Sequence, residues 1–356
     1  MAPHIVVNKT VITFTAVALT ILAVTTMMAE ARDLSSTSTG GYGEEAMKVR
    51  HQQWMAEHGR TYRDEAEKAH RFQVFKANAD FVDASNAAGD DKKSYRLELN
   101  EFADMTNDEF MAMYTGLRPV PAGAKKMAGF KYGNVTLSDA DDDQQTVDWR
   151  QKGAVTGIKN QGQCVDCCCW AFAAVAAVEG IHQITTGNLV SLSEQQVLDC
   201  DTDGNNGCNG GYIDNAFQYI VGNGGLGTED AYPYTAAQAM CQSVQPVAAI
   251  SGYQDVPSGD EAALAAAVAN QPVSVAIDAH NFQLYGGGVM TAASCSTPPN
   301  LNHAVTAVGY GTAEDGTPYW LLKNQWGQNW GEGGYLRLER GANACGVAQQ
   351  ASYPVA

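Results

Sequence analysis

The first residues that could carry out chemistry are a group of cysteines directly before a long apolar stretch. Four of the nine cysteines lie between Cys164 and Cys169, and the next residues, Trp170 to Ile184, have the alanine-rich composition of a buried helix. A thiol becomes a good nucleophile when a nearby base, a cation or a helix N-terminus lowers its pKa. Cys169 stands where this helix should begin, so it is the candidate nucleophile.

Two residues much later in the chain could complete such a site. His303 precedes an apolar run typical of a strand, and Asn324 is followed by Gln325 and Trp326. An imidazole could exchange a proton with the thiol, and an asparagine amide could hold the imidazole in position. Either residue alone would be interpreted as structural, but the combination favours catalysis.

The cysteine group leaves alternatives open. Cys167 could replace Cys169 as the reactive thiol. Thiolates also bind zinc and copper(I), but consecutive cysteines suit a tetrahedral site poorly and no histidine is close in sequence. We therefore expect no metal. An odd number of cysteines implies that at least one thiol stays out of intramolecular disulfides.

Together these motifs resemble those of the papain-like cysteine proteases, most of all the plant members. The resemblance covers about residues 44–356 and implies a cysteine endopeptidase without a cofactor. It makes Cys169 the nucleophile, His303 the general base and acid, and Asn324 the residue that orients the imidazole. Gln161 would be the oxyanion donor and Trp326 the shield over the His–Asn hydrogen bond. The motifs are Gln161-Gly-Gln-Cys164, Cys169-Trp-Ala-Phe172, Asn302-His303-Ala304 and Lys323-Asn324-Gln325-Trp326-Gly327.

The resemblance also implies a substrate cleft and three disulfides. The backbone of Gly210 and Gly211 and the residue Asn302 would contact the substrate. A mostly apolar pocket would prefer a bulky hydrophobic side chain at the substrate's second residue, P2. Its predicted members are Tyr212, Ile213, Ala276 and Gln350. The implied disulfides are Cys164–Cys208, Cys200–Cys241 and Cys295–Cys345.

The loop before the nucleophile departs from the family pattern. Four residues separate Cys164 from Cys169, which is two more than the family has, and Val165 replaces a glycine that makes room for the substrate backbone. Asp166 would oppose a lowered thiol pKa if it faced Cys169. Because a displacement of about 1 Å can cost about 10²-fold in rate, a protease-shaped binding protein without activity is a further alternative.

The N-terminal third resembles an inhibitory propeptide. We expect a propeptide at 32–145, with a helical inhibitory domain at about 50–110 and a connector at 111–145, before a mature peptidase domain at 146–356. Phe72, Phe75 and Val82 recur at helical spacing as an apolar stripe. The propeptide would lie through the cleft in reverse until acid protonates carboxylates such as Asp104.

Several further elements are expected from local patterns. Thr106 should cap a helix, and Ser193 to Gln196 form a capping-box motif that should open another. Arg118 to Gln145 is rich in Pro, Gly, Lys and Asp, so we expect an extended, poorly packed connector, cleaved near Asp141 to Thr146. A further helix is expected at 262–268, and strands at 273–277, 303–308, 319–322 and 334–338. Helices followed by strands favour an α+β fold with a helical half and a sheet half. The resemblance implies that this is the papain-like fold, with a barrel-like sheet half, preceded by the helical propeptide domain.

Composition limits the partners. Hydrophobic residues make up 45% of the chain and charged residues 17%, which is typical of a globular protein. The net charge of −17 argues against nucleic acid and anionic membranes. We expect a monomer whose partners are polypeptide substrates, its own propeptide and cystatin-type inhibitors.

The first residues have the pattern of a secretory signal. Lys9 precedes an apolar run from Val11 to Val24, and Ala29-Glu-Ala31 offers small residues before a cleavage site at Arg32. A signal peptide at 1–31 would send the chain into the secretory pathway, toward a vacuole, a lysosome-like compartment or the cell exterior. Asn134-Val-Thr136 is the plausible glycosylation sequon.

Overall fold

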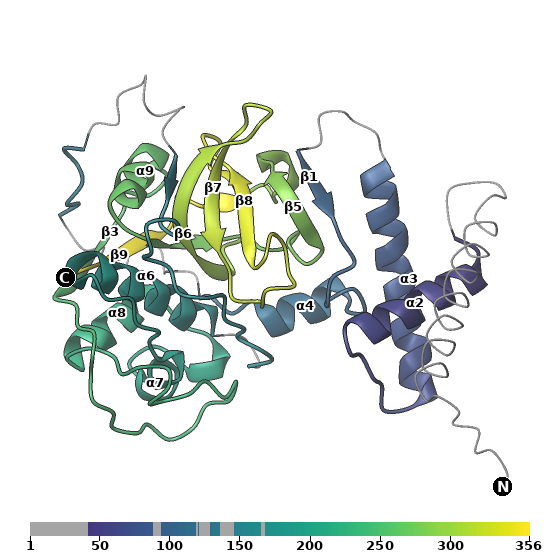
Figure 1. Cartoon of the computed structure of the whole chain (residues 1–356), viewed down its shortest axis with the longest axis horizontal. Coiled ribbons are helices and arrows are strands. Elements are labelled where there is room, and N and C mark those ends of the chain that lie inside the picture. Colours follow the sequence, from purple (N-terminus) through teal and green to yellow (C-terminus); the bar gives the residue numbers. More distant parts are fainter. Residues whose placement is uncertain (1–41, 88–93, 119, 121–128, 136–145, 165–167) are drawn as a thin grey trace, which may run out of the picture. The chain divides into compact units, whose positions relative to one another are not determined.

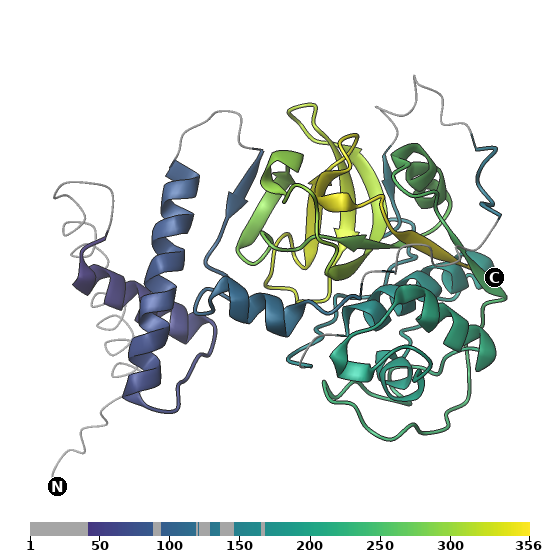
Figure 2. The ribbon, with the colours of Figure 1, turned by 180° about the vertical axis from the view of Figure 1, so that it is seen from behind.

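The computed structural model describes residues 42–87, 94–118, 120, 129–135, 146–164 and 168–356 (Figures 1 and 2). The expected signal peptide, the expected cleavage region at 141–145 and the loop residues Val165, Asp166 and Cys167 lie outside the described residues. The chain divides into two compact units, residues 1–84 and 85–356. No helix among the described residues is both long and apolar enough to cross a bilayer.

The first unit contains α2 (Glu44–Glu57) and most of α3 (Glu65–Ala87). The predicted stripe on α3 is confirmed, because Phe72, Phe75 and Val82 are buried. The ring of His51 on α2 lies 4.9 Å from the ring of Phe75, and an Arg50 nitrogen lies 2.9 Å from an Asp83 oxygen. Packing between buried side chains and a partly buried ion pair therefore hold the two helices together.

Nine strands among the described residues of the second unit form one sheet. All pairs are antiparallel except β5 with β8, which is parallel. The order is β1 (Tyr95–Leu97), β5 (Tyr285–Met290), β8 (Tyr335–Glu339), β7 (Pro318–Lys323), β6 (His303–Thr312), β4 (Val273–Ile277), β9 (Ala351–Val355) and β3 (Gly252–Asp255), while β2 (Val147–Asp148) pairs with β6. The predicted strands correspond to β4, β6, β7 and β8.

Two buried apolar clusters confirm the predicted α+β division. One surrounds the sheet and α9 (Glu261–Asn270). The other is built by α6 (Cys169–Thr186), α7 (Glu194–Cys200) and α8 (Ile213–Gly222), which gather below the strands in both ribbon views. Helix α6 ends at Gly187, whose φ of +77° is the left-handed conformation that glycine supplies at a helix end. Short 3₁₀ turns occupy Gly207–Asn209, Ala292–Ser294 and Ala344–Gly346.

The capping prediction for α7 is half correct. The Ser193 hydroxyl accepts a hydrogen bond from the Gln196 backbone nitrogen, as expected. The reciprocal bond is replaced, because the Gln196 side-chain oxygen accepts from Gly227 N and Ser193 N donates to Gly227 O. Gly227 thus bonds both the Gln196 side-chain oxygen and the Ser193 nitrogen, and these bonds hold the start of α7 against the segment that contains Gly227. By contrast, Thr106 forms the full capping box of α4 (Asn107–Tyr114) with Glu109.

The prediction of a poorly packed connector at 118–145 is wrong for part of it. Tyr132, within it, is 8% exposed, and Leu117, just before it, is 5% exposed. Arg118 donates its backbone N–H to Gly211 O at 2.9 Å. The composition of this segment correctly predicts a loop, but it does not indicate that a few of its large side chains pack on the folded unit.

Candidate active site

The candidate nucleophile is the first residue of a buried helix. Cys169 opens α6, Cys168 occupies the N-cap position, and both are buried. The first N–H groups of a helix have no acceptor within the helix, and they carry positive partial charge that favours a thiolate. In the structure the helix therefore begins at Cys169, as the position of Trp170-Ala-Phe172 in the sequence predicts.

His303 and Asn324 come together as predicted. His303 begins β6 and Asn324 follows β7, which is the antiparallel neighbour of β6. The His303 Nε2 atom lies 2.9 Å from the Asn324 Oδ1 atom. The Trp326 ring stacks on the imidazole at 4.5 Å, with 27° between the planes. Both residues are buried, so the hydrogen bond is sheltered from water.

Helix α6 is bonded to the strand that carries the imidazole. The hydroxyls of Ser274 and Thr306 donate to Ala173 O, at 2.8 and 3.3 Å. Ala304, next to His303, belongs to the same buried cluster as Cys169. The Nδ1 atom of His303 is buried and makes no hydrogen bond to any described residue. Because Nε2 bonds Asn324, Nδ1 is the ring nitrogen left for proton exchange.

Gln161 links the site to the propeptide. Its backbone nitrogen donates to Gln325 O at 2.9 Å, which ties it to the segment of Asn324. Its side-chain nitrogen donates to the carbonyl oxygen of Tyr114, the last residue of α4, at 3.1 Å. The predicted oxyanion donor is thus aimed at a carbonyl, and in this structure that carbonyl belongs to the expected propeptide.

The chain after α4 runs between the helical half and the sheet half. Leu117 N donates to Asn302 O at 3.0 Å, Arg118 N donates to Gly211 O at 2.9 Å, and Gly211 N donates to Gly116 O at 3.3 Å. A Cβ atom on Gly210, whose φ is +87°, would lie 2.6 Å from Gly116 O. Gly210, Gly211 and Asn302 therefore contact a bound peptide backbone, which is the arrangement predicted for substrate.

Two of the residues predicted for the P2 pocket, Ile213 and Ala276, belong to the same buried apolar cluster as Leu117. Ala276 N donates to Gln350 O at 2.9 Å, which places Gln350 beside the pocket through its backbone. Tyr212 is half-buried, and its backbone nitrogen donates to Asn205 Oδ1 at 2.7 Å.

A second thiol beside the nucleophile has a partner that the sequence did not reveal. The Cys168 Sγ atom lies 2.9 Å from the Tyr234 hydroxyl, which in turn donates to Gln161 O at 2.7 Å. Burial raises the pKa of the Cys168 thiol. Cys168 is therefore a neutral thiol held by Tyr234, and no local motif around Tyr234 signals this role.

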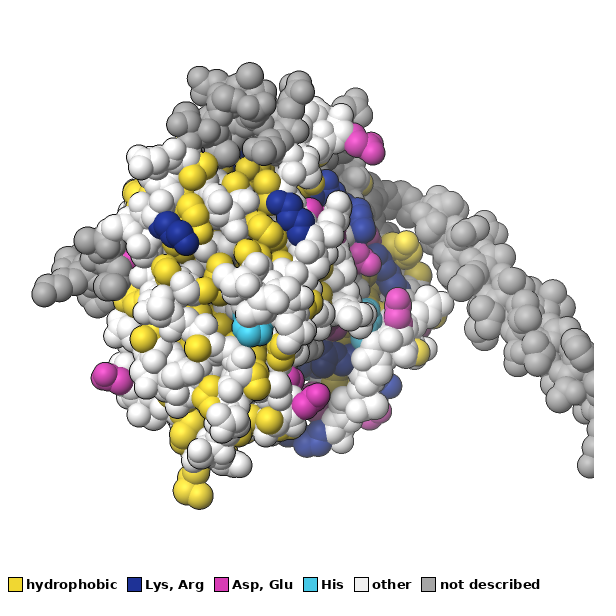
Figure 3. All heavy atoms as spheres, turned by 60° about the vertical axis from the view of Figure 1, so that its left-hand side comes forward, with side chains coloured by type: hydrophobic (Ala, Val, Ile, Leu, Met, Phe, Trp, Pro, Cys, Tyr) yellow, Lys and Arg dark blue, Asp and Glu magenta, His cyan; other side chains and the backbone are white. Residues whose placement is uncertain are grey.

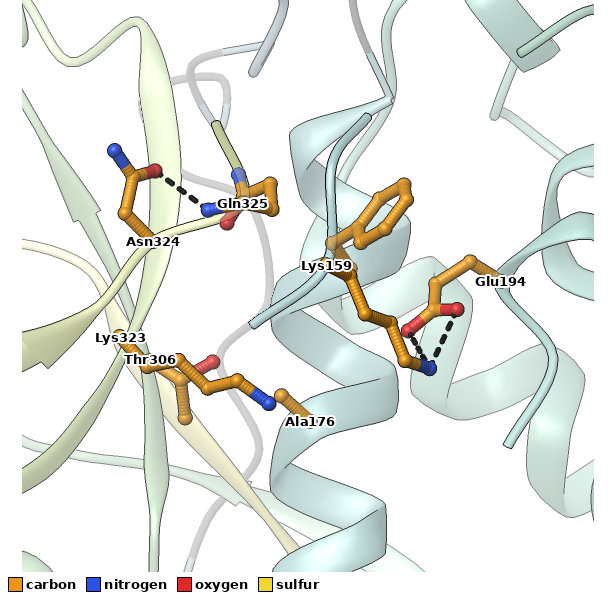
Figure 4. Close-up of a pocket in the computed structure, with 8 residues that line it drawn as sticks. Lys159, Ala176, Glu194, Thr306, Lys323, Asn324 and Gln325 are labelled. Carbon is orange, nitrogen blue, oxygen red and sulfur yellow. Dashed lines mark hydrogen bonds and ion pairs between the residues drawn. The ribbon is translucent and has the colours of Figure 1, made fainter. Parts of the chain in front are cut away.

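Charged side chains that are largely shielded from solvent surround a small pocket, which Asn324 also lines (Figure 4). Lys159 contacts both Glu194 oxygens, at 2.7 and 2.8 Å, and one Glu179 oxygen at 3.1 Å. Lys323, adjacent to Asn324, donates to Thr156 at 2.8 Å and lies 3.9 Å from Glu179. The carboxylates raise the pKa of Lys159 against the opposing effect of burial, and burial raises the pKa of Glu194. The Lys159 cluster, meaning Lys159, Glu179, Glu194 and Lys323, is joined by these contacts, and its members other than Glu179 line the small pocket with Asn324 and Gln325.

The three implied disulfides are confirmed. Cys164 bonds Cys208, Cys200 bonds Cys241, and Cys295 bonds Cys345. Of the described cysteines, this leaves Cys168 and Cys169 as thiols. Because Cys164 is in a disulfide, it cannot be a thiolate ligand. No group of three or more His, Cys, Asp or Glu side chains among the described residues is arranged to hold a metal ion.

The fold and these contacts define a thiol peptidase with an N-terminal segment in its cleft. Residues 144–355 match the family model described as papain family cysteine protease, and residues 51–110 match the cathepsin propeptide inhibitor domain (I29). The chain belongs to the papain family of cysteine proteases and is made with an inhibitory propeptide.

Relatives and solved structures agree with this assignment. The chain is 54% identical over 319 residues to senescence-specific cysteine protease SAG39 of Oryza sativa subsp. japonica, covering 87% of this chain and 91% of that relative. It is 50% identical over 326 residues to cysteine proteinase EP-B 1 of Hordeum vulgare, covering 88% and 85%. The proform of the ragweed allergen Amb a 11 matches with a TM-score of 0.77 and 41% identity, covering 88% and 95%. A recombinant stem bromelain precursor matches with a TM-score of 0.76 and 43% identity, covering 87% and 98%.

Proposed function

We propose that this protein is a secreted endopeptidase zymogen that hydrolyses peptide bonds with Cys169, His303, Asn324 and Gln161. One observation carries the assignment: Cys169 begins a buried helix in the same cluster as Ala304, and the neighbouring His303 is held by Asn324 at 2.9 Å under Trp326. A helix N-terminus and an adjacent imidazole are the two features that activate a thiol.

The chemistry follows from the positions of the donors. The Cys169 thiolate attacks the scissile carbonyl carbon, and the carbonyl oxygen becomes an oxyanion that accepts from Gln161 Nε2 and Cys169 N–H. His303 then protonates the leaving amine, and an acyl-enzyme thioester remains. Water, deprotonated by His303, hydrolyses this thioester and restores the thiol. Asn324 keeps the imidazole oriented throughout, since it bonds the nitrogen that does not exchange the proton.

We infer a preference for a bulky hydrophobic side chain at P2 from the position of Leu117. Leu117 is buried with Ile213 and Ala276, and its neighbours pair with Gly211 as a substrate backbone would. Burial of a leucine side chain contributes about 1.5–3 kcal/mol. Peptide substrates with leucine or phenylalanine at P2 should give kcat/KM values at least ten times those of matched substrates with aspartate there.

The proposal extends to processing and location. Entry into the secretory pathway is consistent with three disulfides, and Asn134 is exposed where a glycan could be attached. The final compartment would be a vacuole, a lysosome-like organelle or the cell exterior, and the active form would be a monomer that cystatin-type inhibitors can block. Glycosidase treatment of the secreted chain, compared with an Asn134→Gln variant, tests the glycan.

The deciding experiment is acid activation of the full-length protein followed by labelling with an epoxide inhibitor and mass spectrometry of the labelled peptide. We expect the label on Cys169, with no labelling of Cys169→Ala and full labelling of Cys168→Ala and Cys167→Ala. Label confined to Cys167 would move the nucleophile to the inserted loop. If no thiol is labelled in a folded protein, the inactive binding protein becomes the correct interpretation.

A further inference from the structure

The connector contains a short folded stretch of its own. In residues 129–135, Gly133 N donates to Phe130 O at 3.3 Å and Val135 N donates to Tyr132 O at 3.0 Å. Tyr132 is buried and Phe130 is half-buried. Gly129 has a φ of +105°, a backbone conformation that favours glycine. These turns present two aromatic rings to the body of the second unit.

The rings enter a site made by three residues from different elements. Tyr353 lies on β9, Gln254 on β3, and Gln271 directly after α9. The Tyr132 ring lies 5.3 Å from the Tyr353 ring, and the Phe130 ring meets the same ring edge-on at 6.2 Å. We call Gln254, Gln271 and Tyr353 the rear socket. Figure 3 looks onto the side with α9, β3 and β9, where hydrophobic side chains emerge and charged ones are few.

Polar bonds fix the position of the stretch in the rear socket. The Tyr132 hydroxyl donates to Gln271 Oε1 at 2.8 Å, in a buried contact. The backbone nitrogen of Lys131 donates to Gln254 Oε1 at 2.8 Å and to the Tyr353 hydroxyl at 3.1 Å. The site therefore recognises a backbone N–H followed by a phenol, and it does not use the Lys131 side chain for these bonds.

The rear socket is held in position by bonds that do not involve the connector. Gln271 Nε2 donates to Pro354 O at 2.9 Å, which leaves Oε1 facing Tyr132. The Tyr353 hydroxyl donates to Gln254 Oε1 at 2.7 Å. Gln271 is only 1% exposed while the stretch is bound, so the Tyr132 phenol reaches an acceptor that is shielded from water.

We propose that residues 129–135 are an additional anchor of the propeptide, separate from the cleft contacts and from the β1–β5 pairing, and that the mature enzyme keeps the rear socket as an exosite for this aromatic turn. The inference rests on the proposed function only in that processing removes the connector. The cleft holds the propeptide through Gly116 and Leu117, and the rear socket holds it through Phe130 and Tyr132. A cut at either end alone leaves the fragment bound by the other contacts.

Binding of a labelled peptide tests the anchor without requiring activity. The full-length Cys169→Ala protein is folded, its propeptide is removed with an added endopeptidase, and a fluorescein-labelled peptide of residues 129–135 is titrated by anisotropy. We expect saturable binding. Phenylalanine in place of Tyr132 should weaken it about 5- to 10-fold, which corresponds to about one hydrogen bond, and alanine there should abolish it. Peptide N-methylated at Lys131 should also fail to bind.

The matched control is a peptide with alanine in place of Lys131, which keeps both backbone bonds and should bind within about twofold of the original. A cleft-blocking peptide of residues 114–118 should not displace the label. Absence of saturable binding, equal binding of the Tyr132→Ala peptide, or displacement by the cleft peptide would each overturn the proposal. In the intact zymogen, Tyr132→Ala should activate faster in acid than Lys131→Ala. A protein that binds the peptide but never becomes active would refute the proposed function and leave the anchor standing.

Discussion

The side-chain nitrogen of Gln161 lies 3.1 Å from the carbonyl oxygen of Tyr114. A residue expected to stabilise the oxyanion of a reacting substrate is thus bonded to a carbonyl of the chain's own propeptide. The neighbouring rings reinforce this placement, because Phe110 and Tyr114 pack edge-on against Trp326 at 4.9 and 6.4 Å. The propeptide therefore packs against Trp326, which shields the His303–Asn324 hydrogen bond. At the same time it accepts a hydrogen bond from Gln161, the predicted oxyanion donor.

Removal of the Gln161 amide should slow the chemical step selectively. We expect Gln161→Ala to lower kcat about 10²- to 10³-fold with KM little changed, because the donor acts on charge that develops only in the transition state. Steady-state kinetics on a fluorogenic peptide with leucine at P2 measures both constants. Gln151→Ala, an exposed glutamine of the same unit, should behave as the unchanged protein. A rise in KM alone would show that Gln161 only binds substrate.

The sequence predicted much of this site because its residues stand in recognisable local contexts. Cys169 precedes the apolar run of α6, and His303 precedes that of β6, so apolar composition marked both positions and the family motifs implied their roles. Tyr234 and Asn205 had no such context, since their roles come from bonds to Gln161 and Tyr212 that only the tertiary fold creates.

Elements without periodicity were the ones that sequence patterns missed. Strand β5 contains three consecutive glycines, which weaken any strand signal. The glycines are there for close contact, because a Cβ on Gly288 would lie 2.2 Å from Ser94 O. The docking of Phe130 and Tyr132 was missed for a different reason: the residues around them favour a loop, and the surface that receives them is formed by distant segments.

Loss of the Tyr234 hydroxyl should disturb Gln161 through its backbone. Tyr234→Phe removes the bond to Gln161 O and the partner of Cys168, so we expect a loss of about 1 kcal/mol in unfolding free energy and a several-fold fall in kcat. Urea unfolding and steady-state kinetics measure these. Cys168→Ser keeps a donor toward the Tyr234 hydroxyl and should retain activity. Unchanged kcat in Tyr234→Phe would mean that the Tyr234 hydroxyl does not help to position Gln161 for catalysis.

Removal of one charged side chain from the Lys159 cluster should lower the free energy of unfolding strongly. Lys159→Met leaves Glu194 and Glu179 buried, with only Lys323 at 3.9 Å from Glu179. An uncompensated buried charge costs about 3–5 kcal/mol, measured as unfolding free energy of the full-length Cys169→Ala protein. Glu98→Gln is the control, because it removes one side of an exposed ion pair with Arg96 and should cost under about 1 kcal/mol. Equal effects of the two changes would show that the buried carboxylates of the cluster do not depend on the Lys159 charge.

Asp201 should make the folded protein more stable in acid than at neutral pH. Burial raises the pKa of its carboxyl to about 6, above the value of about 3.9 for an unfolded aspartate. The folded state therefore binds the proton more tightly, and this contribution is fully present below about pH 4 and is lost as the pH rises through 6. Allowing for solvent screening, the loss is about 1–2 kcal/mol.

Asn in place of Asp201 resembles the protonated carboxyl and keeps an acceptor for Asn205, whose side-chain oxygen positions Tyr212 at the predicted P2 pocket. Asp201→Asn should thus remove most of this pH dependence from urea unfolding of the full-length Cys169→Ala protein between pH 4 and 7, with the variant the more stable at pH 7. Asp230→Asn, which changes an exposed aspartate of the same unit, should keep the original profile. Asp201→Asn and the unchanged protein could instead lose stability in parallel across this range. The Asp201 carboxyl would then be ionised throughout, and other bonds in the fold would have to compensate for its burial.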